Sequence, residues 1–203
     1  MNVDEFLEQD CNRRRFLENS ARNAAGVAAG FVGLGTSASA AGSPGERIRA
    51  GVIGVRSQGK SLAHLLAGRP DVSVRGLCDV QESLREAVGS EVAEMQGTAP
   101  STTDDYRRIL DDDEIDIVVI ATPDHWHAAM VLDACAAGKD IYLEAPVSHT
   151  IREGQAMCAA VRESGCVVQC GLQQRSGAHF RSAVEAVRSG EIGAVRLAKA
   201  WVV

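Results

Sequence analysis

The chain has 203 residues, of which 45% are hydrophobic, 4% are aromatic and 24% are charged. This length accommodates one ordinary domain plus a targeting segment, and the scarcity of aromatic residues predicts a core of Val, Ile, Leu and Ala. The formal net charge of -6 argues against nucleic-acid binding, because a surface that follows phosphates needs an excess of basic residues.

Residues 1–40 have the pattern of an export signal. Arg13 and Arg14, followed by one residue and then Phe and Leu, match the twin-arginine motif that the twin-arginine translocation machinery reads. An Ala- and Gly-rich run follows, and residues 38–40 (Ala-Ser-Ala) resemble a cleavage site. The run is too short for a permanent membrane span. The sequence therefore predicts an exported, periplasmic protein; the alternative is an ordinary amphipathic N-terminal helix.

Residues 41–46 contain Gly42, Pro44 and Gly45, and we expect a flexible linker there. The six cysteines of the chain include no Cys-x-x-Cys pair. We therefore expect no metal site and no disulfide framework, with most of the cysteines acting as small buried hydrophobic residues.

From Arg47 onward, short apolar runs alternate with amphipathic segments. Strands are expected at residues 48–55, 72–77, 115–121, 141–143 and 167–170, and helices at residues 57–66, 82–95, 128–135 and 151–164. The continuous β-branched run in residues 115–121 is typical of a buried parallel strand. The alternation predicts an α/β fold, a Rossmann-type doubly wound parallel sheet that covers residues 47–171.

The first strand leads into a glycine-bearing turn, and ligands of such sheets bind beyond the carboxyl ends of the strands. The turn runs from Gly54 to Gly59, but Arg56 replaces the middle glycine of the pattern Gly-x-Gly-x-x-Gly. Asp79 ends the second strand about twenty residues later, where an acid accepts hydrogen bonds from the ribose hydroxyls of a dinucleotide. The alternative role for Asp79 is a helix N-cap. Together these residues predict a site for NAD rather than NADP, because a carboxylate repels a 2′-phosphate.

Three groups of polar residues are interpreted without invoking a metal site. His125 and His127 are two residues apart at the start of a helix and do not share a helical face, so we expect a capping or cofactor-contacting role and not a metal site. Ser57 is expected to cap the first helix. The acidic run at residues 111–114 is expected to be a solvated loop.

The segments that follow the strands resemble those of a known family. They read Ile-Ala-Thr-Pro-Asp-His-Trp-His at residues 120–127, Tyr-Leu-Glu-Ala-Pro at 142–146, Gly-Leu-Gln-Gln-Arg at 171–175 and Gly-Glu-Ile-Gly at 190–193. From residue 47 to residue 203 the chain resembles the glucose–fructose oxidoreductase and inositol dehydrogenase family (Gfo/Idh/MocA). The resemblance implies an N-terminal Rossmann domain that holds NAD or NADP. It also implies a C-terminal α/β domain for substrate binding and homo-oligomer contacts, and hydride transfer on a sugar, polyol or related hydroxyl carbon.

The resemblance also implies roles by position. Gly54, Arg56 and Gly59 would belong to the phosphate turn, and Asp79 would contact the ribose. The residues that would line the rest of the cofactor cleft are Thr122, Pro123, Asp124 and His127, with Glu144 and Pro146 near the nicotinamide. Gln173 and Arg175 would lie on the substrate side.

Two residues depart from the family pattern. Ala145 replaces the lysine of the Glu-Lys-Pro triplet, which is the usual cation of the catalytic site, so no catalytic residue is assigned and His149 is the substitute candidate. Arg56 obstructs the approach of a pyrophosphate or, alternatively, binds it through its guanidinium group.

Residues 172–203 are expected to form a connecting helix and the first strand of a second, truncated domain. The leading hypothesis is an exported NAD-dependent oxidoreductase that acts on a sugar- or polyol-like hydroxyl, represented by its cofactor domain. The alternatives are an NAD-dependent glycosidase and a catalytically inactive cofactor-binding remnant.

Overall fold

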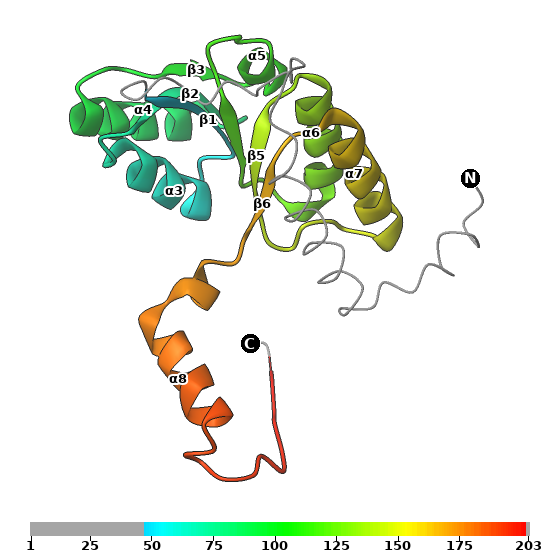
Figure 1. Ribbon diagram of the computed structural model, residues 1–203. Helices are drawn as coiled ribbons and strands as arrows, with labels where there is room; N and C mark the ends of the chain where they lie inside the picture. The colour runs from blue at the N-terminus through cyan, green and yellow to red at the C-terminus, as the bar shows by residue number, and fades with distance from the viewer. Residues whose placement is uncertain (1–46, 202–203) are drawn as a thin grey trace, which may run out of the picture. The chain divides into compact units, whose positions relative to one another are not determined.

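The computed structural model describes residues 47–201, so the expected signal at residues 1–40 and the linker at 41–46 lie outside the described residues. A six-stranded sheet forms the centre of the fold, in the order β3-β2-β1-β4-β5-β6 (Figure 1). Its strands are β1 (Ile48–Ile53), β2 (Val72–Cys78), β3 (Ser101–Thr103), β4 (Ile117–Ile120), β5 (Asp140–Glu144) and β6 (Val168–Gly171). All neighbouring strands pair in parallel, as the sequence predicted.

Helices cover both faces of the sheet (Figure 1). They are α3 (Ser57–Ala67), α4 (Glu82–Gln96), α5 (Arg107–Leu110), α6 (Asp124–Ala136) and α7 (Ile151–Ser164). After the last strand the chain continues in the 3-10 helix η1 (Gln173–Ser176) and in α8 (Ala178–Arg188), which does not pack on the sheet. In the part of the chain that the structure describes, no helix is both long enough and apolar enough to cross a membrane.

The apolar residues divide into two cores, one on each face. Val52, Val74 and Val119 pack with residues of α3 and α4 on one face. Ile120 and Ile141 pack with residues of α5, α6 and α7 on the other. Because both faces are covered, the central strands are apolar on both sides, which explains the continuous β-branched runs in the sequence.

Two short elements were not expected from the sequence. β3 consists of Ser-Thr-Thr at the edge of the sheet, and α5 is a four-residue helix that buries Ile109 and Leu110. Neither has the apolar periodicity that predicts an element. Conversely, the expected strand near the chain end is not observed, since residues 194–201 are assigned to no regular element.

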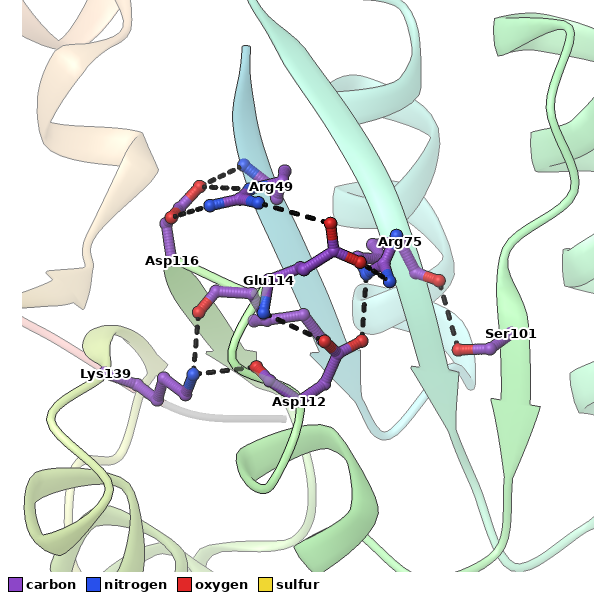
Figure 2. A network of polar contacts seen from close by, with 8 residues as sticks. Arg49, Arg75, Ser101, Asp112, Glu114, Asp116 and Lys139 are labelled. Atoms are coloured by element: carbon purple, nitrogen blue, oxygen red, sulfur yellow. Dashed lines mark hydrogen bonds and ion pairs between the residues drawn. The ribbon is translucent and has the colours of Figure 1, made fainter. Parts of the chain in front are cut away.

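An ionic network lies at the amino ends of the strands, on the edge opposite their carboxyl ends (Figure 2). Arg49 binds Asp116 at 2.9 Å, and Arg75 binds Asp112 at 2.9 Å and Glu114. The buried Lys139 donates hydrogen bonds from Nζ to the carbonyl oxygens of Asp112 (2.8 Å) and Ile115 (2.9 Å). The acidic run was expected to be merely solvated, but two of its members balance the arginines of β1 and β2.

Candidate functional site

A cavity of about 700 Å³ lies beyond the carboxyl ends of β1, β2 and β4. The order β2-β1-β4 reverses direction at β1, and this is the position at which doubly wound sheets bind ligands. Its lining comprises Ile53, Gly54, Arg56, Cys78, Asp79, Val80, Asp104, Asp105, Tyr106, Arg107, Arg108, Ala121, Thr122, Pro123, Trp126 and Met130. Five of the residues predicted to contact the cofactor are therefore brought to one cavity.

The turn after β1 requires glycine at both of its ends. Gly54 has a φ of +84°, and a Cβ there would lie 2.8 Å from the carbonyl oxygen of Ala121. A Cβ on Gly59 would lie 1.7 Å from the carbonyl oxygen of Gly54, which is far closer than atoms can approach. The two glycines therefore bring the start of α3 directly against the end of β1, as a phosphate-binding turn requires.

Arg56 occupies the position of the middle glycine without backbone strain. Its φ of -77° and ψ of -166° are extended, and any residue adopts this conformation. Arg56 is the N-cap of α3, and no side chain caps this helix, so the expected cap by Ser57 is wrong. Ser57 is instead the first helical residue. The first backbone N–H groups of α3 therefore lack a side-chain acceptor and can bind an anion.

Asp79 is held in place by backbone groups. Its Oδ2 accepts a hydrogen bond from Val55 N and its Oδ1 accepts one from Gln81 N, both at 3.0 Å. Arg85 donates to the carbonyl oxygen of Asp79 at 2.6 Å. A carboxylate accepts about four hydrogen bonds, so Asp79 retains acceptor capacity for ribose hydroxyls while these bonds fix its orientation.

Glu144 is buried and links the end of β5 to the start of α3. Its Oε1 accepts a hydrogen bond from Gln58 Nε2 at 3.1 Å, and its Oε2 accepts one from Ala145 N at 3.3 Å. A Cβ on Gly171 would lie 2.8 Å from Oε1, so the glycine leaves room for the carboxylate. Burial raises the pKa of Tyr142, and the Glu144 carboxylate raises this pKa further.

Asp124 and His149 form an exposed pair on neighbouring segments. Asp124 Oδ2 lies 3.2 Å from His149 Nδ1, and Asp124 Oδ1 lies 3.9 Å from His125 Nδ1. The hydrogen bond from His149 lowers the pKa of Asp124. The loop after β5 thus places His149, the substitute candidate for the missing lysine, beside the first turn of α6.

His127 is enclosed within the fold rather than exposed to the cavity. It is 1% exposed, and its Nδ1 and Nε2 lie 2.8 Å from the carbonyl oxygens of Pro146 and Thr122, respectively. Both ring nitrogens are therefore engaged by the backbone. Gln173 and Arg175, expected on the substrate side, are exposed in η1 and do not line the cavity.

Several wall residues were missed by sequence reasoning. Tyr106 and Arg107 form part of the lining, with the Arg107 guanidinium 4.8 Å from the centre of the Tyr106 ring. They belong to the short segment around α5, which has no recognisable pattern. Gln58 occupies a variable position of the glycine motif, so its contact with Glu144 could not be foreseen. Trp126 lies within the recognised segment 120–127 and Met130 lies further along α6, and the sequence specifies the individual contacts of neither residue.

Comparison with known proteins gives a consistent result. Residues 48–172 match the model of an oxidoreductase family with an NAD-binding Rossmann fold (GFO_IDH_MocA). The chain is 33% identical to an uncharacterized oxidoreductase, YrbE, of Bacillus subtilis over 155 residues, which is 76% of this chain and 44% of that protein. It is 29% identical to an alpha-N-acetylgalactosaminidase of Shewanella oneidensis over 160 residues, covering 70% of this chain and 35% of that protein.

Solved structures of inositol dehydrogenases are similar in fold. The myo-inositol 2-dehydrogenase of Lactobacillus plantarum superimposes with a TM-score of 0.66 at 25% identity, over 74% of this chain and 43% of that one. The scyllo-inositol dehydrogenase of Lactobacillus casei, solved with bound NAD(H) and scyllo-inositol, has a TM-score of 0.65 at 21% identity, over 73% and 43%. The chain spans less than half the length of these relatives.

Proposed function

This chain belongs to the Gfo/Idh/MocA oxidoreductase family, and from that membership we propose that it is the NAD-holding part of an enzyme that transfers hydride to or from a sugar- or polyol-like hydroxyl. The observation that carries the proposal is the glycine turn after β1, which contacts Asp79 directly and lines with it a cavity of about 700 Å³ at the reversal of strand order. NAD is the cofactor of this family fold, and when bound it supplies the hydride acceptor or donor.

The residues of the cavity fit the parts of NAD. The uncapped N-terminus of α3, with Arg56 beside it, provides donors for the pyrophosphate. Asp79 provides acceptors for the adenosine ribose, and Val80, Tyr106 and Trp126 provide apolar surface for the adenine ring. We assign the nicotinamide end to the side of Glu144 and Pro146. There His127 would support the cleft from within, because its ring is buried.

Isothermal titration calorimetry of the full chain with NAD and NADP tests this assignment. We expect NAD to bind and NADP to bind more weakly, because the 2′-phosphate meets the Asp79 carboxylate. A chain that binds neither nucleotide would refute the proposal. Tighter binding of NADP would show that Asp79 does not face the ribose.

A second candidate is an NAD-dependent glycosidase, favoured by the 29% identity to an alpha-N-acetylgalactosaminidase. Such an enzyme would oxidise its sugar transiently and release NAD unchanged. Steady-state absorbance at the nicotinamide band separates the candidates. A dehydrogenase changes this absorbance when free sugars are added. A glycosidase releases the aglycone of a glycoside and leaves the nicotinamide absorbance without net change. This measurement requires the complete enzyme.

A non-catalytic cofactor-binding remnant is the third candidate, and Ala145 is the residue that favours it. The conformation of Arg56 does not favour this candidate, because the turn holds the arginine in an ordinary extended conformation without backbone strain.

We further propose that the protein is exported through the twin-arginine pathway, on the basis of Arg13, Arg14 and the small residues at 38–40. Replacing both arginines with lysine should retain the protein in the cytoplasm. Fractionation of cells that express the wild-type chain and the double variant measures this. Continued export of the double variant would exclude the twin-arginine route.

A further inference from the structure

Two cysteines that are distant in the sequence lie close together in the fold. Cys135 belongs to the last turn of α6, and Cys166 follows α7 and precedes β6. The Sγ atom of Cys166 lies 4.0 Å from the carbonyl oxygen of Cys135, although 31 positions separate the two residues. Both thiols are free in the structure. The pair arises from the packing of α6 against α7 (Figure 1), so the spacing of the cysteines in the sequence does not indicate it.

The two cysteines differ in their access to solvent. Cys135 is 5% exposed and packs in the core below α6 and α7, whereas Cys166 is partly exposed. Burial raises the pKa of Cys135, a hydrogen bond from Ser164 lowers this pKa, and the neighbouring Cys166 thiol raises it through its charge and a hydrogen bond. An oxidant in solution therefore meets Cys166 first, and Cys135 lies where it can react with the sulfur of Cys166.

Hydrogen bonds hold the backbone on both sides of Cys166. Gly165 ends α7 in the left-handed conformation, with a φ of +73°, and this allows the chain to turn sharply. Cys166 N donates to Ser164 Oγ at 3.3 Å, and Val167 N donates to Asp140 Oδ1 at 2.8 Å. Asp140 begins β5, the strand that follows α6. The place of Cys166 beside the end of α6 is therefore fixed by contacts to two other segments.

We propose that Cys135 and Cys166 form a disulfide bond when the folded chain is in an oxidising compartment. The oxidant is the disulfide of a small thiol or of a thiol–disulfide exchange protein. The thiolate of Cys166 attacks this disulfide and releases one thiol, and the thiolate of Cys135 then attacks the Cys166 sulfur and releases the second. Two protein thiols are thus oxidised to one disulfide, and their two electrons and two protons reduce the oxidant to two thiols.

The bond closes a loop that carries β5, the segment from Glu144 to Pro146, and α7. Cys135 shortly precedes β5 and Cys166 shortly precedes β6, so the bond lies at the amino ends of these strands. Glu144 lies at the carboxyl end of β5, away from the bond. A closed loop of about 30 residues restricts the unfolded chain, and this stabilises the fold. The disulfide therefore fastens the elements below the candidate cofactor site without occupying the site.

Equilibration of the full wild-type chain with oxidised glutathione tests the proposal. Free thiols are then blocked by alkylation, and peptide mapping with mass spectrometry locates the disulfide. We expect one pair of peptides joined through Cys135 and Cys166, with a mass about 2 Da below that of the two reduced peptides together. Oxidation should raise Tm by about 5–10 °C relative to the reduced chain.

Cys158, which is exposed on α7, provides the matched control. Cys166→Ser should remove both the bond and the redox-dependent rise in Tm, whereas Cys158→Ser should retain both. Free thiols at Cys135 and Cys166 after equilibration would overturn the proposal, and so would a glutathione adduct that persists on Cys166. A disulfide between any other two of the six cysteines, in place of this pair, would also contradict it.

Formation of the bond in cells rests on the proposed export, because the periplasm is an oxidising compartment. The wild-type chain in the periplasmic fraction should carry the bond. The chain retained in the cytoplasm by replacement of Arg13 and Arg14 with lysine should keep both thiols free. An exported chain with both thiols free would overturn the disulfide. A chain that is not exported but forms the bond with oxidised glutathione would refute the proposed export alone.

Discussion

The carboxylate of Asp79 accepts hydrogen bonds from the backbone and keeps acceptor capacity for the expected cofactor. Its two oxygens accept hydrogen bonds from Val55 N and Gln81 N, so the side chain is oriented before any ligand arrives. Pre-orientation of this kind reduces the entropy lost on binding. The same negative charge disfavours a 2′-phosphate.

Replacing Asp79 with asparagine should therefore weaken NAD binding and reduce the preference over NADP. We expect a loss of about ten-fold for NAD, because hydrogen bonds to a charged group contribute more than neutral ones. Calorimetry with both nucleotides measures the two effects. Asp113→Asn, which removes an exposed carboxylate from the acidic loop, is the matched control and should change neither affinity. Equal losses in both variants would indicate a general effect of charge.

Gly59 is the residue on which the geometry of the turn depends most directly. An alanine Cβ at this position would lie 1.7 Å from the carbonyl oxygen of Gly54, so the turn or α3 must move. We expect Gly59→Ala to lower the free energy of unfolding by about 3 kcal/mol and to abolish measurable NAD binding. Urea unfolding and calorimetry provide the two measurements.

Gly68 at the other end of α3 supplies the control. Its added Cβ would be no closer than 3.4 Å to another atom, an ordinary contact. Gly68→Ala should fold and bind NAD like the wild type. If Gly59→Ala behaves in the same way, the turn is not as tight as described.

At the site, residues inside a recognised motif were predictable and residues that act through tertiary contacts were not. Gly54 and Asp79 each follow a strand of the parallel sheet, and the carboxyl ends of parallel strands meet at one edge. Their position at the cavity therefore follows from the order of strands and helices in the sequence. The contact of Gln58 with Glu144 joins residues 86 positions apart. The engagement of both His127 nitrogens likewise depends on how the segment after β5 folds back, which no local pattern encodes.

Among the helices, α7 has the most explicit start signal. The hydroxyl of Thr150 accepts a hydrogen bond from Glu153 N at 3.2 Å, and the Glu153 carboxylate accepts one from Thr150 N at 2.7 Å. This reciprocal capping box satisfies donors that the first turn leaves open. α3, in contrast, has no side-chain cap, which suits a helix whose N-terminus is to meet an anion.

Thr150→Ala should consequently lower the free energy of unfolding by about 1 kcal/mol. Chemical unfolding followed by circular dichroism measures the change. Ser57→Ala at the start of α3 is the control, because that side chain does not cap its helix and its removal should have little effect on stability. A larger loss from Ser57→Ala than from Thr150→Ala would contradict the capping assignments.

The ionic network at the amino ends of the strands gives a pH-dependent contribution to stability. Hydrogen bonding from Arg49 lowers the pKa of Asp116 in the folded chain. A carboxyl group with a lowered folded pKa stabilises the protein above its unfolded pKa, and this contribution is lost as the pH falls through the folded value. Solvent screening limits the size of the effect, because the Asp116 side chain is 45% exposed.

The Arg49→Met variant should therefore lose less stability than the wild type between neutral pH and about pH 3. Urea unfolding at both pH values measures the difference. Arg69→Met removes the partner of Asp71 in a pair that is exposed on the surface, and its pH dependence should differ less from the wild type. Identical pH profiles for Arg49→Met and the wild type would show that this pair contributes nothing to acid sensitivity.

For the molecule as a whole, the parallel sheet was predictable because its strands are buried on both faces. The apolar run at Ile117–Ile120 and the alternation with helices leave few other arrangements. The edge strand beside β2 was less predictable than the central strands. β3 is polar and three residues long, and it is recognisable as a strand only through its pairing with β2. Lys139 is buried through carbonyl contacts that no sequence pattern indicates.

The chain spans less than half the length of the relatives it matches, so a test of catalysis joins it to the C-terminal portion of a relative. Two features bear on the activity expected under the proposed function. Ala145 stands where the family resemblance implies a lysine next to the reacting hydroxyl, and the resemblance implies that a C-terminal domain supplies the other wall of the substrate pocket. Grafting the C-terminal portion of a family member after residue 172 separates the two causes, with Ala145 retained in one chimera and replaced by lysine in the other.

The chimera with Ala145 should bind NAD but turn over slowly. Ala145→Lys in the same chimera should increase kcat by roughly two to four powers of ten, the range in which a positioned acid or base contributes. NAD affinity should change little, because the lysine acts on the hydroxyl rather than on the nucleotide. Steady-state kinetics across pH would then reveal an added ionisation in the lysine chimera. If the alanine chimera is already fast, another group must activate the hydroxyl, and His149, paired with Asp124 at 3.2 Å, becomes the residue to replace next.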